Sequence, residues 1–282
     1  MTFKLPELED DGLSTPDISE WGEEKYRLVG YYATLFANSM KGKWGSRVYI
    51  DLFAGAGRAR IKDTNRILPA SPLLALDVKK KFDRYIFSEK DPDKAAALEE
   101  RVKRDYPSVD AHVIAGDTNH NVDKIIQLIP TARPSFTVLS FCFADPFKLK
   151  NLAFDTIQSL SARFMDFLVL IPSGMDANRN VAEYTKPGNA TVDRFLGTVA
   201  WRAEWDAAKL RGESFEHFLS DYFGRQMREL NYLYSNVEDM KIMRSTDKNL
   251  LLYRLAFFSR NERGQRLWEQ SRKYSDDQRS FF

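Results

Sequence analysis

The chain repeats one pattern that strongly limits its fold: a short apolar run that ends in an acidic residue and is followed by a turn. The pattern occurs four times, and the runs end at Asp51, Glu89, Asp117 and Asp145. A fifth apolar run, 167–171, ends at Pro172. Runs that are apolar throughout are typical of parallel strands buried on both faces. Ligands of such sheets bind outside the carboxyl ends of the strands, so we expect the four acids to line one cleft.

Helix-like segments of ten to fifteen residues separate the runs, which predicts an α/β fold with a mostly parallel sheet and helices on both faces. The acidic segment 1–22 reads as a flexible arm, and 23–172 as the cofactor-binding core. We interpret 173–249 as a helical insertion that binds a substrate or a partner. It begins with a loop rich in Gly, Asn and Pro and contains two predicted helices with aromatic stripes, 191–203 and 214–230. We expect 250–282 to close the same domain with a strand and a helix.

Composition excludes several classes of protein. The 282 residues carry a net charge of +2 and include one cysteine, Cys142, and three histidines, so neither a disulfide framework nor a usual metal-ligand pattern is present. We therefore expect no metal. The acidic N-terminus resembles no signal peptide, and no apolar run approaches the roughly 20 residues of a membrane span. These features predict a cytoplasmic protein that does not enter a membrane.

The turn after the first run combines an acid with small residues: Asp51, Phe53, Ala54, Gly55 and Gly57. Glycines without Cβ atoms let a ligand approach the backbone closely. The spacing differs from the dinucleotide fingerprint GxGxxG, and an acid in this place suits a ligand with an ammonium group better than a pyrophosphate. The simpler alternative is an ordinary strand-to-helix turn.

The next two acids suggest a nucleoside site. Glu89, with Lys90 beside it, follows the second strand, where doubly wound folds bind ribose hydroxyls. Asp117 and Thr118 follow the third strand and could accept from an adenine amine. The alternative is that Glu89 and Asp117 only serve the turns and helix starts behind them, as Asp91 is expected to do.

Asp145, Pro146 and Phe147 follow the most apolar run of the chain. The proline fixes the backbone just past the strand. Asp145 could then accept from an amine that is being alkylated, and Phe147 could stack on its ring. The alternative is a strand-end turn with Phe147 in the core.

Five further residues are weaker candidates for contact with a substrate: Arg58, Ser71, Ser173, Asp176 and Arg179. Arg58 begins a basic stretch, 58–66, that could touch phosphates or be no more than a solvated loop. Ser71 starts the next helix, and the other three lie in the loop past the fifth strand.

Together the motifs resemble those of class I S-adenosylmethionine-dependent methyltransferases. The segments that carry the resemblance are DLFAGAGR, FSEKDP, AGDTN and FADPF. More narrowly, the whole chain resembles the three-Cys-motif partner family, through SPLLAL, DFLVLIPSGMDANRN and LLYRLAFFSRNERGQRLWE. That resemblance implies a methyltransferase-like Rossmann fold, S-adenosylmethionine as cofactor, and a genetic neighbour similar to radical S-adenosylmethionine proteins as partner.

Carried over position by position, the resemblance gives Asp51, Gly55 and Gly57 to the methionine moiety, Glu89 to the ribose, and Asp117 with Thr118 to the adenine. The segment Asp145 to Phe147 resembles the (Asp/Asn)-Pro-Pro-(Tyr/Phe) motif of amino-methyltransferases. One proline is missing, which puts the aromatic residue one place early.

The function predicted from the sequence is methyl transfer to an amine, with nucleic-acid bases among the acceptors. Such a base would be flipped into the pocket if it came from a duplex. The second interpretation is a protein that binds the same cofactor and docks on a partner without turnover. The missing fingerprint argues against a dehydrogenase, and the absence of GxxxxGK(S/T) argues against a phosphate-loop enzyme. The sequence leaves the oligomeric state open.

Overall fold

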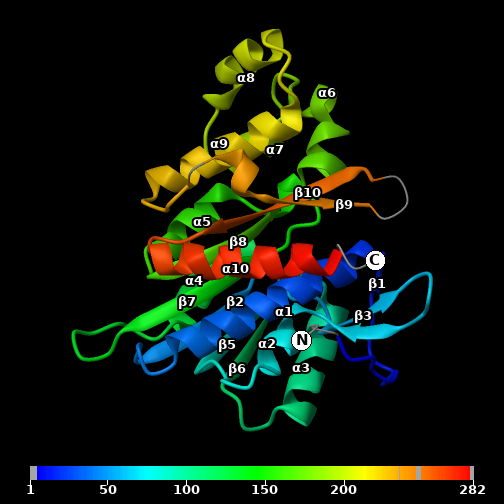
Figure 1. The fold of residues 1–282 in the computed structure, drawn as a ribbon, viewed down its shortest axis with the longest axis vertical. Helices are drawn as coiled ribbons and strands as arrows, with labels where there is room; N and C mark the ends of the chain where they lie inside the picture. Colours follow the sequence, from blue (N-terminus) through cyan, green and yellow to red (C-terminus); the bar gives the residue numbers. More distant parts are fainter. Residues whose placement is uncertain (1–4, 235, 246–248, 280–282) are drawn as a thin grey trace.

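The computed structural model describes residues 5–234, 236–245 and 249–279, and a seven-stranded sheet forms their centre (Figure 1). Its first five strands are parallel, β10 runs antiparallel to β8, and β9 runs antiparallel to β10. The strands in spatial order are β6 Ala111–Ala115, β5 Arg84–Glu89, β2 Ser46–Asp51, β7 Val138–Ala144, β8 Met165–Ile171, β10 Leu251–Phe258 and β9 Lys241–Arg244.

Helices cover both faces of this sheet, so the predicted α/β, Rossmann-like fold is confirmed. Side chains alternate between the faces, as Tyr49 and Ile50 of β2 show by joining two different apolar cores. The first face carries α1 Trp21–Met40, α2 Ser71–Leu76, α3 Pro92–Asp105 and α10 Glu262–Arg279. The second carries α4 Thr118–Leu128, α5 Phe154–Ser161, α7 Thr191–Leu196, α8 Trp201–Leu210 and α9 Phe215–Glu229.

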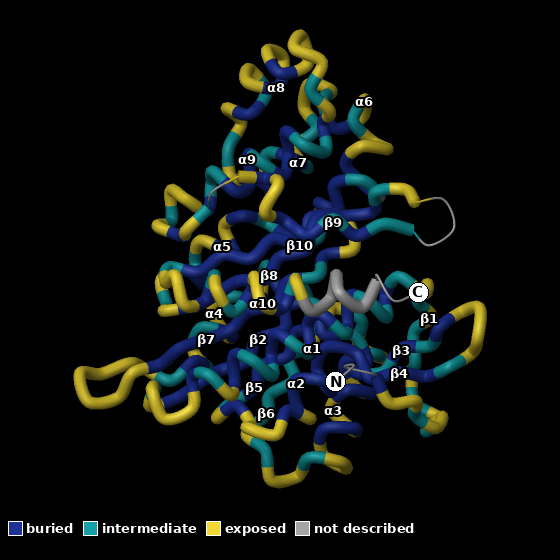
Figure 2. The backbone as a smooth tube through the Cα atoms, viewed as in Figure 1, coloured by how far each residue is buried: buried dark blue, intermediate teal, exposed yellow. Residues whose placement is uncertain are grey.

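Burial follows the same plan. The central strands are buried along their length, whereas exposed residues gather in the connecting loops and at the outer end of α8 (Figure 2). Short elements complete the second half: the π-helix η2 Ser173–Asn178, α6 Val181–Tyr184, and the 3-10 helices η1 Leu149–Asn151 and η3 Val237–Asp239. In the described part of the chain, no helix has both the length and the apolar character needed to cross a membrane.

A second, small sheet differs from the expected basic loop at 58–66. There β3 Arg58–Ile61 pairs antiparallel with β4 Ile67–Pro69, and β1 Asp17–Ile18 adds parallel to β3. The arginines of this hairpin are ion-paired with acids of the N-terminal segment, for example Arg60 with Asp10. This charge pairing links residues about fifty positions apart, which a local reading of the sequence does not reveal.

The N-terminal segment, expected as a flexible arm, packs against the core from Leu5 onward. Leu5 is only 2% exposed and lies in a small apolar cluster with Tyr26, Ile61 and Leu68. Burial of these few apolar side chains, together with ion pairs, outweighs the acidic composition on which the prediction rested. Residues 1–4 lie outside the described part.

The expected helix at 191–203 is two helices, because Gly197 ends α7 in a left-handed conformation (φ +70°). A left-handed residue closes a helix C-terminus, and glycine adopts it without steric cost.

Candidate functional site

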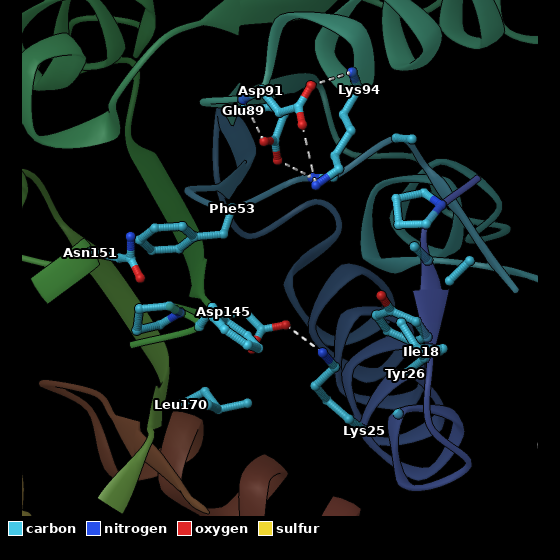
Figure 3. A pocket seen from close by; sticks show the side chains of 18 of the residues that line it. Ile18, Lys25, Tyr26, Phe53, Glu89, Asp91, Lys94, Asp145, Asn151 and Leu170 are labelled. Atoms are coloured by element: carbon cyan, nitrogen blue, oxygen red, sulfur yellow. Dashed lines mark hydrogen bonds and ion pairs between the residues drawn. The ribbon is translucent and has the colours of Figure 1, made fainter. Parts of the chain in front are cut away.

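A cavity of about 660 Å³ opens at the carboxyl ends of the parallel strands. The chain runs from β2 outward to β5 and β6 and then returns to β7 on the other side of β2. This reversal of strand order is the switch point at which doubly wound sheets bind ligands. The lining comes from the strand ends, the glycine turn and the N-terminal segment, and includes Pro16, Ile18, Trp21, Lys25, Tyr26, Phe53, Gly55, Arg58, Glu89, Lys90, Lys94, Asp117, Thr118, Asp145, Pro146, Phe147, Asn151, Leu170 and Tyr253 (Figure 3).

The structure brings the four strand-end acids to this one edge of the sheet. Glu89, Asp117 and Asp145 line the cavity. Asp51 is fully buried and is not among the lining residues. Its Oδ1 accepts a hydrogen bond from the backbone N–H of Phe53 at 3.1 Å.

Burial raises the pKa of Asp51 to about 7, against hydrogen bonds from Ser71 and Phe53 that favour its charged form. The nearby carboxylates of Asp145 and Glu89 add to the rise. A cation bound in the cavity would favour the ionised form of Asp51, because an opposite charge lowers the pKa of a carboxyl group.

The glycine turn is held from below by Glu89. Its Oε2 accepts from the backbone N–H of Gly55 at 2.7 Å, and its Oε1 accepts from that of Asp91 at 2.8 Å. Gly55 has φ +63° with open space where a Cβ would stand, whereas a Cβ on Gly57 would lie 2.9 Å from Leu98 Cδ1. Glu89 therefore shapes the turn and keeps lone pairs free for a ligand on the cavity side.

Asp117, the third acid, has the expected role of a helix cap and also an ion pair that the sequence did not predict. Asp117 caps α4 by accepting from Asn119 N at 3.0 Å, and its other oxygen accepts from Lys90 Nζ at 2.9 Å. Burial opposes the charge, but the bonds from Lys90 and Asn119 hold the pKa of Asp117 below its ordinary value. Thr118 is 3% exposed and lines the cavity, and among the described residues its hydroxyl has no hydrogen-bond partner. A buried hydroxyl without a partner is a place where a ligand can bind.

Asp145 is engaged by a residue that the sequence analysis did not select. Lys25 Nζ donates to Asp145 Oδ2 at 2.5 Å, and the two side chains are 8% and 18% exposed. Figure 3 shows them pointing toward one another across the cavity, from α1 and from the end of β7. Pro146 is buried beside them, and the adjoining Phe147 is 71% exposed rather than in the core.

Of the weaker candidates, only Arg58 lines the cavity. Its guanidinium donates to the carbonyl of Glu9 and pairs with Asp11, whereas its Nε has no partner among the described residues, so only part of the side chain is left for the predicted contact with phosphates. Ser71 lies beneath the cavity, where it contributes a hydrogen bond to Asp51.

The other three weaker candidates, Ser173, Asp176 and Arg179, are not among the lining residues. Asp176 accepts from Leu149 N and from the Tyr184 hydroxyl, each at 2.8 Å, which ties η2 to the segment after Phe147. Its carboxylate is used in holding the backbone, so its role here is structural.

Sequence reasoning missed the contribution of α1. The helix buries residues 22, 25, 26, 28, 29, 32 and 33, so Lys25 stands on the apolar stripe of an amphipathic helix. A charged residue on such a stripe is a signal for a buried partner, because charges are rarely buried unpaired. Three of the other missed lining residues, Trp21, Tyr26 and Tyr253, are aromatic, and in a sequence such residues resemble ordinary core positions.

Comparison with known proteins agrees with the fold. No family model matches the chain, and no curated protein matches its sequence. Among solved structures, the chain is similar to protein LPL1258 from Legionella pneumophila, with a TM-score of 0.51 and 13% identity over 90% of this chain and 93% of that one. The fold and its cleft make this chain a Rossmann-like α/β protein, whereas the resemblance to the three-Cys-motif partner family stays a prediction.

Two further similar structures have TM-scores of 0.42 and 8% identity. One is magnesium protoporphyrin IX methyltransferase from Synechocystis with bound S-adenosylhomocysteine, covering 84% of this chain and 86% of that one. The other is Trm1 from Pyrococcus horikoshii with S-adenosylmethionine, covering 86% of this chain and 58% of that one.

Proposed function

We propose that the chain is an S-adenosylmethionine-dependent methyltransferase that binds its cofactor in the cavity at the switch point. The observation that carries the proposal is the convergence of three strand-end acids and a glycine turn on this cavity, with the fourth strand-end acid, Asp51, buried at the same edge of the sheet. Its volume of about 660 Å³ lies within the range of small-molecule pockets. The cofactor supplies a methyl group on a positively charged sulfur, and the carboxylates at the strand ends suit that charge.

The residues present fit the cofactor. Gly55 leaves open space beside the backbone, so a ligand can approach the turn. Thr118 offers a buried hydroxyl without a partner among the described residues. Glu89 retains free lone pairs on both oxygens after holding the turn. Asp51 is the group whose ionisation a cation would favour.

For the acceptor we propose an amine, with a nucleic-acid base as the first class to test. Asp145 would accept from the amine and balance its developing positive charge. Phe147, with 71% of its surface exposed, is available to stack on a planar base. Methyl transfer needs little beyond holding the nitrogen in line with the methyl group, so positioning supplies most of the acceleration.

Calorimetric titration with S-adenosylmethionine, S-adenosylhomocysteine and NAD tests the cofactor. We expect the first two to bind and NAD not to bind. Asp51→Ala and Glu89→Ala should abolish binding, whereas Asp206→Asn, on the exposed side of α8, serves as the matched control and should retain it. Absence of binding by both sulfur ligands, or equal binding of NAD, would refute the proposal. A radiolabelled-methyl screen of acceptors, starting with RNA and DNA, then follows.

The ion pair on Asp145 favours a second candidate function in the same cavity. With one carboxylate oxygen already bound to Lys25 and one proline of the motif missing, the chain would bind the cofactor and dock on a partner without turnover. The resemblance to the three-Cys-motif partner family supports a radical S-adenosylmethionine-like protein as that partner. Single-turnover transfer of labelled methyl by the isolated chain would exclude this candidate.

A further inference from the structure

The Lys25–Asp145 pair lies where the acceptor must enter. Lys25 belongs to the second turn of α1, Asp145 follows β7 directly, and both line the cavity. Burial disfavours the charge on Lys25, but the Asp145 carboxylate raises the pKa of the ammonium above its ordinary value. The ammonium is therefore protonated at neutral pH.

A purely structural role explains this pair poorly. Removing two charges from water costs several kcal/mol per ion, so a buried ion pair seldom stabilises a fold more than apolar residues of the same volume. The pair also lies in the wall of an open cavity rather than inside either apolar core. Its position is better explained by contact with a ligand.

Both partners keep unused hydrogen-bonding capacity. An ammonium group carries three donors, and in the described part of the chain Lys25 Nζ donates one hydrogen bond, to Asp145 Oδ2. Asp145 Oδ1 receives none from the described residues. The Tyr253 hydroxyl is also buried, lines the same cavity and has no partner among the described residues. The lining thus holds a donor, an acceptor and a third polar group without a partner.

Aromatic rings border this polar group. Lys25 Nζ lies 4.7 Å from the ring centroid of Tyr26 and 5.7 Å from that of Trp21. The Trp21 ring contacts Tyr253 edge to face at 5.1 Å between centroids. A site with flat apolar walls and paired polar groups is suited to a planar heterocycle rather than to an alkyl amine.

We propose that Lys25 and Asp145 recognise the acceptor together. Asp145 Oδ1 accepts a hydrogen bond from the amine of the methyl acceptor. The Lys25 ammonium donates one to an unprotonated ring nitrogen that is bonded to the carbon bearing this amine. Lys25 is thereby a specificity-determining residue, and the acceptor class is a planar amino-heterocycle with an amine beside a ring nitrogen. This inference rests on the proposed methyltransferase function and deepens it.

In the transfer step the lone pair of the amine nitrogen forms the new N–C bond to the methyl carbon. The C–S bond breaks, and its electron pair stays on sulfur, which becomes neutral. The positive charge that moves to nitrogen is balanced by the Asp145 carboxylate. The methylated nitrogen then loses its extra proton to Asp145 Oδ1 and from there to solvent.

The test uses two fragments that differ in their ring nitrogens, 2-aminopyrimidine and aniline. Both are titrated into the full chain saturated with S-adenosylhomocysteine, which keeps them out of the cofactor site, and binding is measured by ligand-observed NMR. A hydrogen bond to a charged group contributes about 1.5–3 kcal/mol, so the wild type should prefer 2-aminopyrimidine by about tenfold or more.

Lys25→Met should abolish this preference, and Lys25→Arg, which keeps charge and donors, should retain much of it. Lys150→Met, exposed on η1 and outside the cavity lining, is the matched control and should behave as wild type. Thermal melting checks that each variant folds. Comparing ratios between fragments cancels general losses of binding, as in a double-mutant cycle.

An unchanged preference in Lys25→Met, or no preference in the wild type, would overturn the inference and leave the cofactor proposal intact. Failure of S-adenosylhomocysteine to bind would instead overturn the proposed function, and this inference with it. The two failures are therefore distinguishable.

Discussion

Arg101 on α3 joins the N-terminal segment to the glycine turn, and its replacement by methionine is expected to loosen both. The side chain is fully buried. It makes a bidentate pair with Asp11, at 2.9 and 2.6 Å, and donates to the carbonyl of Ser14 and the hydroxyl of Thr15. It also donates to the carbonyl of Ala56, inside the glycine turn, at 2.6 Å. Arg101→Met removes all of these bonds and preserves most of the buried volume.

The expected loss of stability follows from the partners left behind. Removing one partner of a buried ion pair typically costs about 3–5 kcal/mol. Asp11 keeps Arg58 at 3.3 Å and Arg104 at 3.0 Å, so the lower end of that range applies. A loss of about 3 kcal/mol lowers the Tm of a chain of this size by about 6 °C, at roughly 2 °C per kcal/mol.

Urea denaturation followed by circular dichroism measures this loss at neutral pH. Arg104→Met is the matched control, because Arg104 is 40% exposed and also contacts Asp11, and exposed pairs contribute less than about 1 kcal/mol. The effect should also depend on pH. The bonds from Arg101, against an opposing effect of burial, lower the pKa of Asp11 well below its ordinary value of 3.8.

A carboxyl group whose pKa is depressed in the folded state contributes stability above its unfolded pKa and loses it as the pH falls. The difference between wild type and Arg101→Met should therefore shrink progressively below about pH 4. If both arginine variants lie within about 1 kcal/mol of the wild type, the conclusion that Arg101 holds the N-terminal segment on the glycine turn is wrong.

Three further predictions concern the cavity. Because burial raises the folded pKa of Asp51 to about 7, this group should make the unliganded protein less stable, and its affinity for S-adenosylmethionine higher, as the pH rises from about 4 to 7. In melting, Asp51→Asn should weaken the stability trend, to which the buried Asp166 also contributes, and in calorimetry it should remove the affinity trend. Gly57→Ala should lower Tm more than Gly55→Ala, because an added Cβ at position 57 would lie 2.9 Å from Leu98, whereas one at position 55 meets open space. The main effect of Gly55→Ala should be weaker cofactor binding, measured by titration. Phe147→Ala should change the free energy of unfolding by less than about 0.5 kcal/mol but weaken binding of a stacked acceptor by about 1–3 kcal/mol, measured by titration.

The sequence predicted the central sheet and the meeting of its acids for a clear physical reason. Strands buried on both faces need continuous apolar runs, and parallel strands bring their carboxyl ends to one edge. The helix cap at Asp91 was equally readable, because its carboxylate accepts from the backbone N–H groups of Asp93 and Lys94.

The sequence did not predict the small sheet, or the wall of the cavity that the N-terminal segment and α1 form. β1 has two residues and β3 has four, which is too short for a periodic pattern to appear. The wall depends on long-range pairs such as Lys25–Asp145 and Arg101–Asp11, which join residues 120 and 90 positions apart. The place of Lys25 on the apolar stripe of α1 indicates a buried partner, but the sequence does not show which distant acid that partner is.

The N-terminal segment and the glycine turn are in physical contact, and this has a thermodynamic consequence for binding. Pro16 and Ile18 line the cavity, while Arg101 ties the residues just before them to Ala56 of the turn. A ligand that touches both must stabilise their docking, and by reciprocity a loosened segment must bind that ligand more weakly. Arg101→Met should therefore weaken binding of S-adenosylhomocysteine although Arg101 is not among the lining residues, and the ligand should protect the segment before α1 from proteolysis in the wild type. Unchanged affinity in the variant, with cleavage unaffected by ligand, would show that the segment covers the cavity without taking part in binding.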